Sequence, residues 1–355
     1  MTTPFRTQAP AAQTTDIAGH PVTMHYGDVS AEYEQLRSGA GVVDHDARGR
    51  LRIEGPRAAE MLNGMVTNDT AELPTGRGVY AAALTPKGKI VADLRIQRVE
   101  DEVFYVDAPM RAHVGWMGMV RKYVNPRLAP YRDVSAETTV VSVTGAQARK
   151  AVARALGSSL EALPELPSFS SETLSVDGTA VTVSRVPELW DHAYELLAPV
   201  DFRESLWSRL ADAGAVPVGL AAWEIARVES GRPEWGLDID DTTIPQEANF
   251  DDLHAISYTK GCYVGQEVVA RIHFRGHVNR NLRGLLCGEE LPAMHATLHD
   301  AAGKVVGDAR SAVRSPRLGA IALAMVRREV GMGSTLSARW EGGESRVEVV
   351  PLPFP

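Results

Sequence analysis

The chain has 355 residues, a formal net charge of −8 and only two cysteines, Cys262 and Cys287. This length is enough for two or three compact units, each with a hydrophobic core. The acidic balance argues against direct binding of nucleic acid or of an anionic membrane. The chain contains no run of about eighteen apolar residues, so no membrane span is predicted. Two cysteines are too few for a disulfide framework, which favours a cytoplasmic protein.

The first twenty residues are rich in Thr, Ala and Gln and lack a basic start followed by an apolar block. They predict a flexible tail over residues 1–20 and not a signal peptide. Two later stretches, 51–62 and 140–152, each have the pattern of a short strand, a glycine turn and the start of a helix. Two more, 104–123 and 194–213, each have the pattern of a strand that runs into a helix.

Matching positions in these pairs lie 90 residues apart, from position 55 to position 145 and from position 108 to position 198. The repeated offset favours two related α+β units, although strand-glycine-helix patterns are common enough to arise by chance. A further helix is expected over 220–230, followed by a connector rich in Gly, Asp and Pro. After about residue 280 the pattern changes to short strands separated by glycine turns, which predicts a small C-terminal β-barrel.

A basic strip interrupts the acidic chain between positions 260 and 283. It holds five Lys or Arg residues and one acid, so its local charge is +5 − 1 = +4. Such a strip is a candidate site for an anionic ligand, and the alternative is a solvated face that balances acids elsewhere. The five cations are Lys260, Arg271, Arg275, Arg280 and Arg283.

Cys262 follows Lys260 by two positions, and a nearby ammonium group stabilises a thiolate. A buried, inert thiol is the alternative for Cys262, and Cys287 lies in an apolar run that predicts a core residue. The chain has no Cys-x-x-Cys pair or other cluster with metal-ligand spacing, so no metal site is predicted.

The segment 260–267 resembles the signature of the folate-binding YgfZ family, which is linked to assembly or repair of iron–sulfur proteins. Other segments are similar to the wider glycine cleavage T-protein (aminomethyltransferase) superfamily; they are 66–69, 76–80, 86–93, 227–231 and 244–248. The residues that carry the YgfZ resemblance are Lys260, Gly261, Cys262, Tyr263, Gly265, Gln266 and Glu267.

The resemblance implies three domains around a central folate channel, with two related α+β units and a C-terminal β-barrel. It places an aminomethyltransferase-like folate-binding region at 21–275, divided into units of about 21–135 and 136–275, and the barrel at 276–355. The implied ligand is tetrahydrofolate or a one-carbon derivative of it.

The resemblance also implies which residues hold the folate. Glu247 matches a glutamate that grips the pteridine, and a carboxylate can accept two parallel hydrogen bonds from its amide and amino groups. Arg280, with Arg283 as the alternative, matches an arginine at the acidic side of the folate. The implied lining positions are Tyr80, Val106 and Trp235.

One departure from the T-protein pattern concerns the strand that supplies the catalytic carboxylate. One of two adjacent acids is replaced by Ala92, and Asp93 remains. This replacement places aminomethyl transfer in doubt and leaves open whether the chain is an enzyme. In the expected site Asp93 contacts the reactive edge of the folate, and Cys262, activated by Lys260, acts as a nucleophile or a redox thiol.

The main prediction is therefore a monomeric, cytoplasmic, tetrahydrofolate-binding YgfZ-like protein that supports iron–sulfur cluster assembly or repair. Its partners would be an iron–sulfur carrier or a client such as a tRNA-modifying iron–sulfur enzyme, and Gln266 and Glu267 would position that partner or brace the loop. The first alternative is an aminomethyltransferase that moves a one-carbon unit to tetrahydrofolate. Others are a non-catalytic folate-binding module and an amine-demethylating domain, which would need a flavin-binding segment that the chain lacks.

Overall fold

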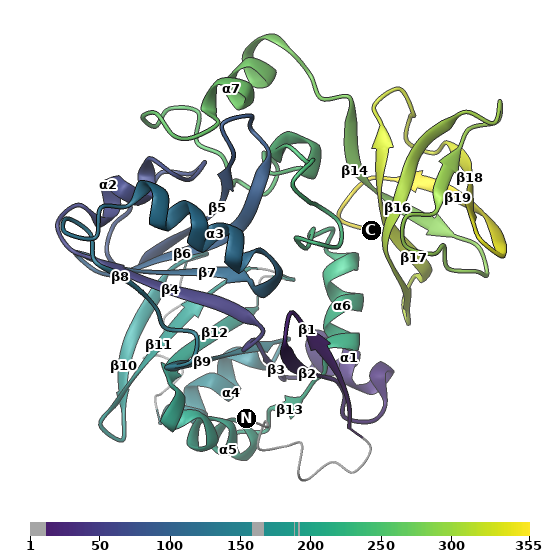
Figure 1. Ribbon diagram of the computed structural model, residues 1–355. Helices are drawn as coiled ribbons and strands as arrows, with labels where there is room; N and C mark the ends of the chain where they lie inside the picture. The colour runs from purple at the N-terminus through teal and green to yellow at the C-terminus, as the bar shows by residue number, and fades with distance from the viewer. Residues whose placement is uncertain (1–11, 158–166, 188, 191) are drawn as a thin grey trace.

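The structure is a computed structural model that describes residues 12–157, 167–187, 189–190 and 192–355. Most of the predicted tail, residues 1–11, lies outside the described residues, whereas 12–20 contain strand β1 (Gln13–Ile17) and the turn into β2 (His20–His25). The chain folds as two α+β units followed by a closed β-barrel (Figure 1), which confirms the predicted fold class.

The first unit is a five-stranded antiparallel sheet in the order β5-β6-β7-β4-β8. Helices α2 and α3 cover one face of this sheet (Figure 1). Its elements are β4 (Arg48–Glu54), α2 (Ala58–Asn63), β5 (Arg77–Leu84), β6 (Ile90–Glu100), β7 (Val103–Pro109), α3 (Met110–Tyr123) and β8 (Tyr131–Asp133).

The second unit repeats this order within a six-stranded sheet, β10-β11-β12-β9-β3-β13. Its elements are β3 (Gly41–Asp44), β9 (Thr138–Thr144), α4 (Ala148–Ala155), β10 (Ser171–Val176), β11 (Thr179–Arg185), β12 (Ala193–Pro199), η2 (Val200–Phe202), α5 (Arg203–Asp212) and β13 (Val216–Pro217). The matching turns after β4 and β9 are Gly55 and Gly145, with φ of 101° and 120°. Only glycine adopts such angles readily, so the repeated glycine has a conformational cause.

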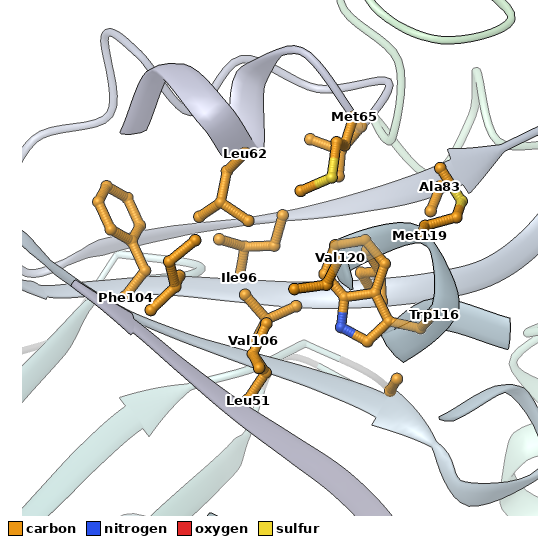
Figure 2. Close-up of a cluster of buried hydrophobic side chains, with 14 of the residues drawn as sticks. Leu51, Leu62, Met65, Ala83, Ile96, Phe104, Val106, Trp116, Met119 and Val120 are labelled. Carbon is orange, nitrogen blue, oxygen red and sulfur yellow. The ribbon is translucent and has the colours of Figure 1, made fainter. Parts of the chain in front are cut away.

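The core of the first unit lies between its sheet and its helices. Figure 2 shows Leu62 of α2 and Trp116 and Val120 of α3 close to Ile96 and Val106 of the sheet. Side chains alternate between the two faces of a strand, so the intervening residues of β6 and β7 face away from these helices. That second face is polar, and it contributes to the site described below.

The barrel closes in the strand order β14-β17-β16-β15-β18-β19. It is preceded by α6 (Leu220–Glu229), η3 (Pro245–Ala248) and α7 (Gln266–Arg275). The barrel strands are β14 (Arg280–Cys287), β15 (Thr297–His299), β16 (Val305–Ser315), β17 (Gly319–Arg327), β18 (Thr335–Trp340) and β19 (Gly343–Val350). Among the described residues, every helix is too short or too polar to cross a lipid bilayer.

The carboxylate of Glu229, at the end of α6, joins three parts of the chain. It accepts a hydrogen bond of 2.8 Å from the Tyr33 hydroxyl of α1 (Val29–Arg37) and another from Ser315 of the barrel strand β16. The guanidinium groups of Arg37 and Arg317 each lie 3.6 Å from the same carboxylate. Glu229 is 2% exposed, so these contacts are needed to offset the loss of its hydration.

Candidate active site

A cavity of about 170 Å³ lies where the two units meet helix α6. Its wall is built from β1 and β2, the β3–β4 connection, β5 and β6, the start of α3, α6 and the turn that follows α6. Segments far apart in the sequence therefore supply one site, as expected of a ligand pocket at a domain junction.

Asp93 and Tyr80 are the two predicted site residues that line this cavity. Ala92 and Leu94, the neighbours of Asp93 on β6, point into the helix-covered core, so Asp93 points the other way. The Tyr80 hydroxyl donates a hydrogen bond of 3.1 Å to Asp93 Oδ2, and both side chains are buried. The acid that remains is therefore the one that faces the cavity, and Ala92 occupies a core position.

The ring of Tyr80 is held from two sides. Its centroid lies 5.3 Å from that of Phe250, and the guanidinium of Arg232 lies 5.7 Å from it on the cavity side. A cation placed over an aromatic face is attracted by the ring quadrupole. These contacts orient the Tyr80 hydroxyl toward Asp93.

Glu234 is a second carboxyl group on the cavity wall, in the turn after α6. Its side chain is 21% exposed, and Oε1 lies 3.7 Å from Nη1 of Arg111. The pKa of Glu234 is raised to about 7 overall, chiefly by burial; the charge of Arg48 opposes this rise and the charge of Asp93 adds to it. A carboxyl group with such a pKa carries a proton for part of the time at neutral pH.

Two guanidinium groups of the first sheet share one carboxylate, which is 15% exposed. Arg48 and Arg95 both bind Asp107 of β7, Arg95 Nη2 at 2.8 Å from Asp107 Oδ1. Arg95 also forms an ion pair with Glu195 of β12 and so links the two sheets. Burial alone would raise the pKa of Asp107, but the two guanidinium groups hold this pKa well below its usual range.

On α6, Arg227 is bound by two acids. Its distances are 2.7 Å to Asp238 and 2.8 Å to Glu224. Also on the cavity wall, the ring of His45 packs edge-on against Trp223, with centroids 4.7 Å apart. The wall thus offers aromatic faces together with charged groups of both signs.

Glu247 and Arg280, the predicted anchors for the two ends of folate, bind each other. Arg280 Nε lies 3.1 Å from Glu247 Oε1, and Glu247 Oε2 accepts a 3.0 Å hydrogen bond from the Ile244 N–H. Neither residue lines the cavity. The pair holds the η3 turn against the first strand of the barrel, and the Arg283 guanidinium contacts a neighbouring backbone carbonyl.

Lys260 is buried, and its ammonium group serves the backbone. Nζ donates to the carbonyl oxygens of Asn63, Val66 and Asn68 at 2.6, 2.7 and 2.8 Å. Cys262 is exposed and does not line the cavity. Cys262 and Glu247, which were expected to face one folate channel, thus both lie outside the lining of this cavity.

The remainder of segment 260–267 packs on the turn between β5 and β6. Gly265 has a φ of 84°, and a Cβ atom there would lie 2.6 Å from the carbonyl oxygen of Thr85. A Cβ atom at Gly88, in the same turn as Thr85, would lie 2.8 Å from the Cβ atom of Val268 in α7. Tyr263 is buried, Glu267 is exposed and the Gln266 N–H bonds the Tyr263 carbonyl. The segment thus fixes a loop to a hairpin.

The remaining predicted lining residues occupy other places. Val106 is fully buried in the core of the first unit (Figure 2). Trp235 is half-buried and packs both against that core and against the cluster that contains Tyr80 and Phe250. Arg95 and Glu234 also line the cavity and were not predicted from the sequence. Arg95 could have been found from strand alternation, because it lies two residues after Asp93 on β6. Glu234 lies in an irregular turn, where no helix or strand periodicity predicts which way a side chain points.

Two protein-family models match this chain. The "GCVT N-terminal domain" family model matches residues 5–257, and the "Glycine cleavage T-protein C-terminal barrel domain" model matches residues 280–354. An aminomethyltransferase of Thermotoga neapolitana is 29% identical over 352 residues, which cover 97% of this chain and 94% of the relative. One of Rubrobacter xylanophilus is 29% identical over 98% of this chain and 91% of its own.

A solved structure has the same fold. The crystal structure of glycine cleavage system aminomethyltransferase T from Bartonella henselae superposes with a TM-score of 0.86 at 23% identity, covering 99% of this chain and 96% of that one. Because these near-full-length relatives are aminomethyltransferases, the prediction of a YgfZ-like role in iron–sulfur cluster assembly is wrong. The motif at 260–267, which resembles the YgfZ signature, here holds a loop in place through Lys260 and Gly265. The predicted superfamily is confirmed, and the chain belongs to the glycine cleavage T-protein family.

Proposed function

We propose that this chain is an aminomethyltransferase that moves a one-carbon unit from a lipoyl-bound or other amine donor to tetrahydrofolate. The proposal is supported by the names of its relatives and, above all, by one observation: the Asp93 carboxylate faces a cavity and is held there by Tyr80. The residue pattern had left transfer in doubt because Ala92 replaces an acid. That replacement lies in the core and leaves the cavity's carboxylate in place.

The chemistry of the wall fits a reduced folate. A pterin has flat faces and a row of N–H donors, and the cavity offers the aromatic rings of Tyr80, Phe169 and Trp223 beside the carboxyl group of Asp93. The glutamate tail of folate is anionic, and Arg232 and other guanidinium groups line the same space. Bound folate would supply the amine nitrogens that accept the one-carbon unit.

Asp93 has the central role in this proposal. A buried carboxylate can bind an acceptor N–H and take its proton, and it needs a fixed orientation to do so. Tyr80 supplies that orientation through its hydrogen bond, and the ring of Tyr80 is itself held between Phe250 and Arg232. The water-poor setting strengthens each of these electrostatic contacts.

A turnover assay tests the proposal. Purified protein is given tetrahydrofolate with an aminomethyl-lipoyl donor, and formation of methylenetetrahydrofolate is followed. Asp93→Asn, which keeps the shape and removes the charge, should lower kcat about 100-fold. Glu348→Gln, an exposed glutamate on β19, is the matched control and should keep full activity.

Binding is measured separately from turnover. Calorimetric titration with tetrahydrofolate and with folinic acid should give saturable binding to the wild-type protein. Wild-type protein without turnover, or an Asp93→Asn variant with wild-type kcat, would refute the proposed function.

A further inference from the structure

A second carboxyl group shares the cavity with Asp93, and its surroundings differ. Asp93 receives a hydrogen bond from the Tyr80 hydroxyl. Glu234 enters from the turn after α6, and its carboxylate contacts the Arg111 guanidinium at 3.7 Å, which is longer than a direct hydrogen bond. Two acids in unlike settings on one site commonly divide the proton donor and acceptor roles.

The backbone of Glu234 is firmly held. Its N–H donates to Asp238 Oδ2 at 2.9 Å, and its carbonyl accepts the Asp238 N–H at 2.9 Å. Asp238 is fully buried and is fixed in turn by Arg227 at 2.7 Å and by the Ser311 N–H at 3.0 Å. A group placed on such a support keeps its position during a reaction.

Burial is the main reason that Glu234 can hold a proton, and the charges of Arg48 and Arg227 oppose it. Arg111 lies 3.7 Å away, and the two opposing cations also bind other acids: Arg48 binds Asp107, and Arg227 binds Asp238 and Glu224. The acids Asp93 and Glu224 both disfavour a negative charge on Glu234. The charged groups that face it are Arg48 of β4, Asp93 of β6, Arg111 of α3, and Glu224 and Arg227 of α6.

We infer that Glu234 is the proton donor for the leaving amine and Asp93 the proton acceptor, so that the two carboxyl groups work as an acid–base pair across the cavity. The inference rests on the proposed function, and it assigns the donor side of the same site. It also specifies the donor as one whose amine departs, because a carboxylic acid at this place serves a basic leaving nitrogen.

The proton balance of the amine-releasing step is closed. The bond between the transferred carbon and the amine nitrogen breaks, and its electron pair goes to that nitrogen. Glu234 gives the nitrogen its proton and becomes a carboxylate, while Asp93 takes the proton that the acceptor nitrogen loses on bonding to the same carbon. For a lipoyl-bound donor, the carbon–sulfur bond then breaks with its electron pair going to sulfur, and the sulfur takes the proton that the second folate nitrogen loses on bonding to the carbon. Proton exchange from Asp93 back to Glu234 through solvent restores both carboxyl groups, so no oxidant or reductant is needed.

The decisive variant is Glu234→Gln, which keeps size and removes the proton. Its kcat should fall about 100-fold, while the affinity for tetrahydrofolate measured by calorimetry stays within about twofold. Wild-type kcat should decline as pH rises through about 7, where Glu234 loses its proton, and the variant should lack this decline. Glu234→Asp retains an acid and should recover part of kcat together with a pH-dependent limb.

A readout independent of turnover is the infrared carboxylic-acid band of the protein. A band that titrates near pH 7 should be present in the wild type and in Glu348→Gln and absent in Glu234→Gln. A Glu234→Gln variant with the kcat and pH profile of the wild type would overturn the inference and leave the proposed function standing. Wild-type protein with no turnover would refute both.

Discussion

Replacing Asp107 by Asn should destabilise the protein far more than loss of an ordinary surface ion pair. Asp107 is 15% exposed at its side chain, and it neutralises two guanidinium groups, Arg48 and Arg95, that are 11% and 3% exposed. The Asn variant keeps the volume and leaves two buried cations without their shared carboxylate. Removing one partner of a buried ion pair costs about 3–5 kcal/mol.

Denaturation in guanidinium chloride measures the effect. The expected loss in the free energy of unfolding for Asp107→Asn is about 3 kcal/mol or more at pH 7, with an unchanged slope. The control is Asp177→Asn, which breaks an exposed pair with Arg209 in which the aspartate side chain is 67% exposed. That change should cost under about 1 kcal/mol. Equal losses for the two variants would refute the reasoning.

The same comparison has a defined pH dependence. The pKa of Asp107 is lowered in the folded protein, so its contribution to stability is complete above the unfolded pKa of about 3.9. That contribution disappears as pH falls further toward the folded pKa. The stability gap between wild type and Asp107→Asn should therefore be constant from about pH 8 to pH 5 and shrink below about pH 4.

Three further changes test other parts of the structure. Gly265→Ala should cost about 1–3 kcal/mol in thermal denaturation, because of its φ of 84° and the nearby carbonyl oxygen; Gly261→Ala, with open space around it, should be near neutral. Lys260→Met should cost about 3 kcal/mol, since three backbone carbonyls lose their donor, whereas exposed Lys304→Met should be silent. Glu234→Gln should stabilise the protein by up to about 3 kcal/mol above pH 7 and should have no effect below about pH 4. The reason is that folding raises the pKa of Glu234, so wild-type stability falls as pH rises from the ordinary glutamate pKa to about 7.

Each of the three has an outcome that contradicts it. Equal melting temperatures for the two glycine variants would show that the left-handed turn carries no strain. A neutral Lys260→Met would mean that water replaces the ammonium group at the carbonyls. A stability difference for Glu234→Gln that does not change with pH would mean that Glu234 does not bind a proton in this range.

The repeat could be predicted from the sequence because its signals are local. A strand, a glycine at positive φ and a helix recur at an offset of 90 residues, and Gly55 and Gly145 take the same backbone conformation in both units. The barrel could be predicted for a similar reason, since its strands are short and alternate, with glycine turns between them. Local patterns of this kind need no knowledge of distant contacts.

The site was harder to predict because it depends on which side chains meet. Tyr80 and Asp93, two of the predicted residues, line the cavity from the paired strands β5 and β6. Lys260 looked like an activator of Cys262, but its donors are used by carbonyls almost 200 positions earlier in the chain. Glu247 and Arg280 looked like separate anchors for a ligand, but opposite charges 33 positions apart bind each other.

The meeting of three segments at Glu229 bears on how members of this family could be recombined. A barrel transplanted from a relative would keep its own strand order, yet it would dock on α6 only if it brought a hydroxyl at the place of Ser315 and a cation at the place of Arg317. Without them the buried carboxylate of Glu229 would keep Tyr33 and Arg37 but lose both of its partners from the barrel. Chimeras joined after α6 should therefore carry both residues.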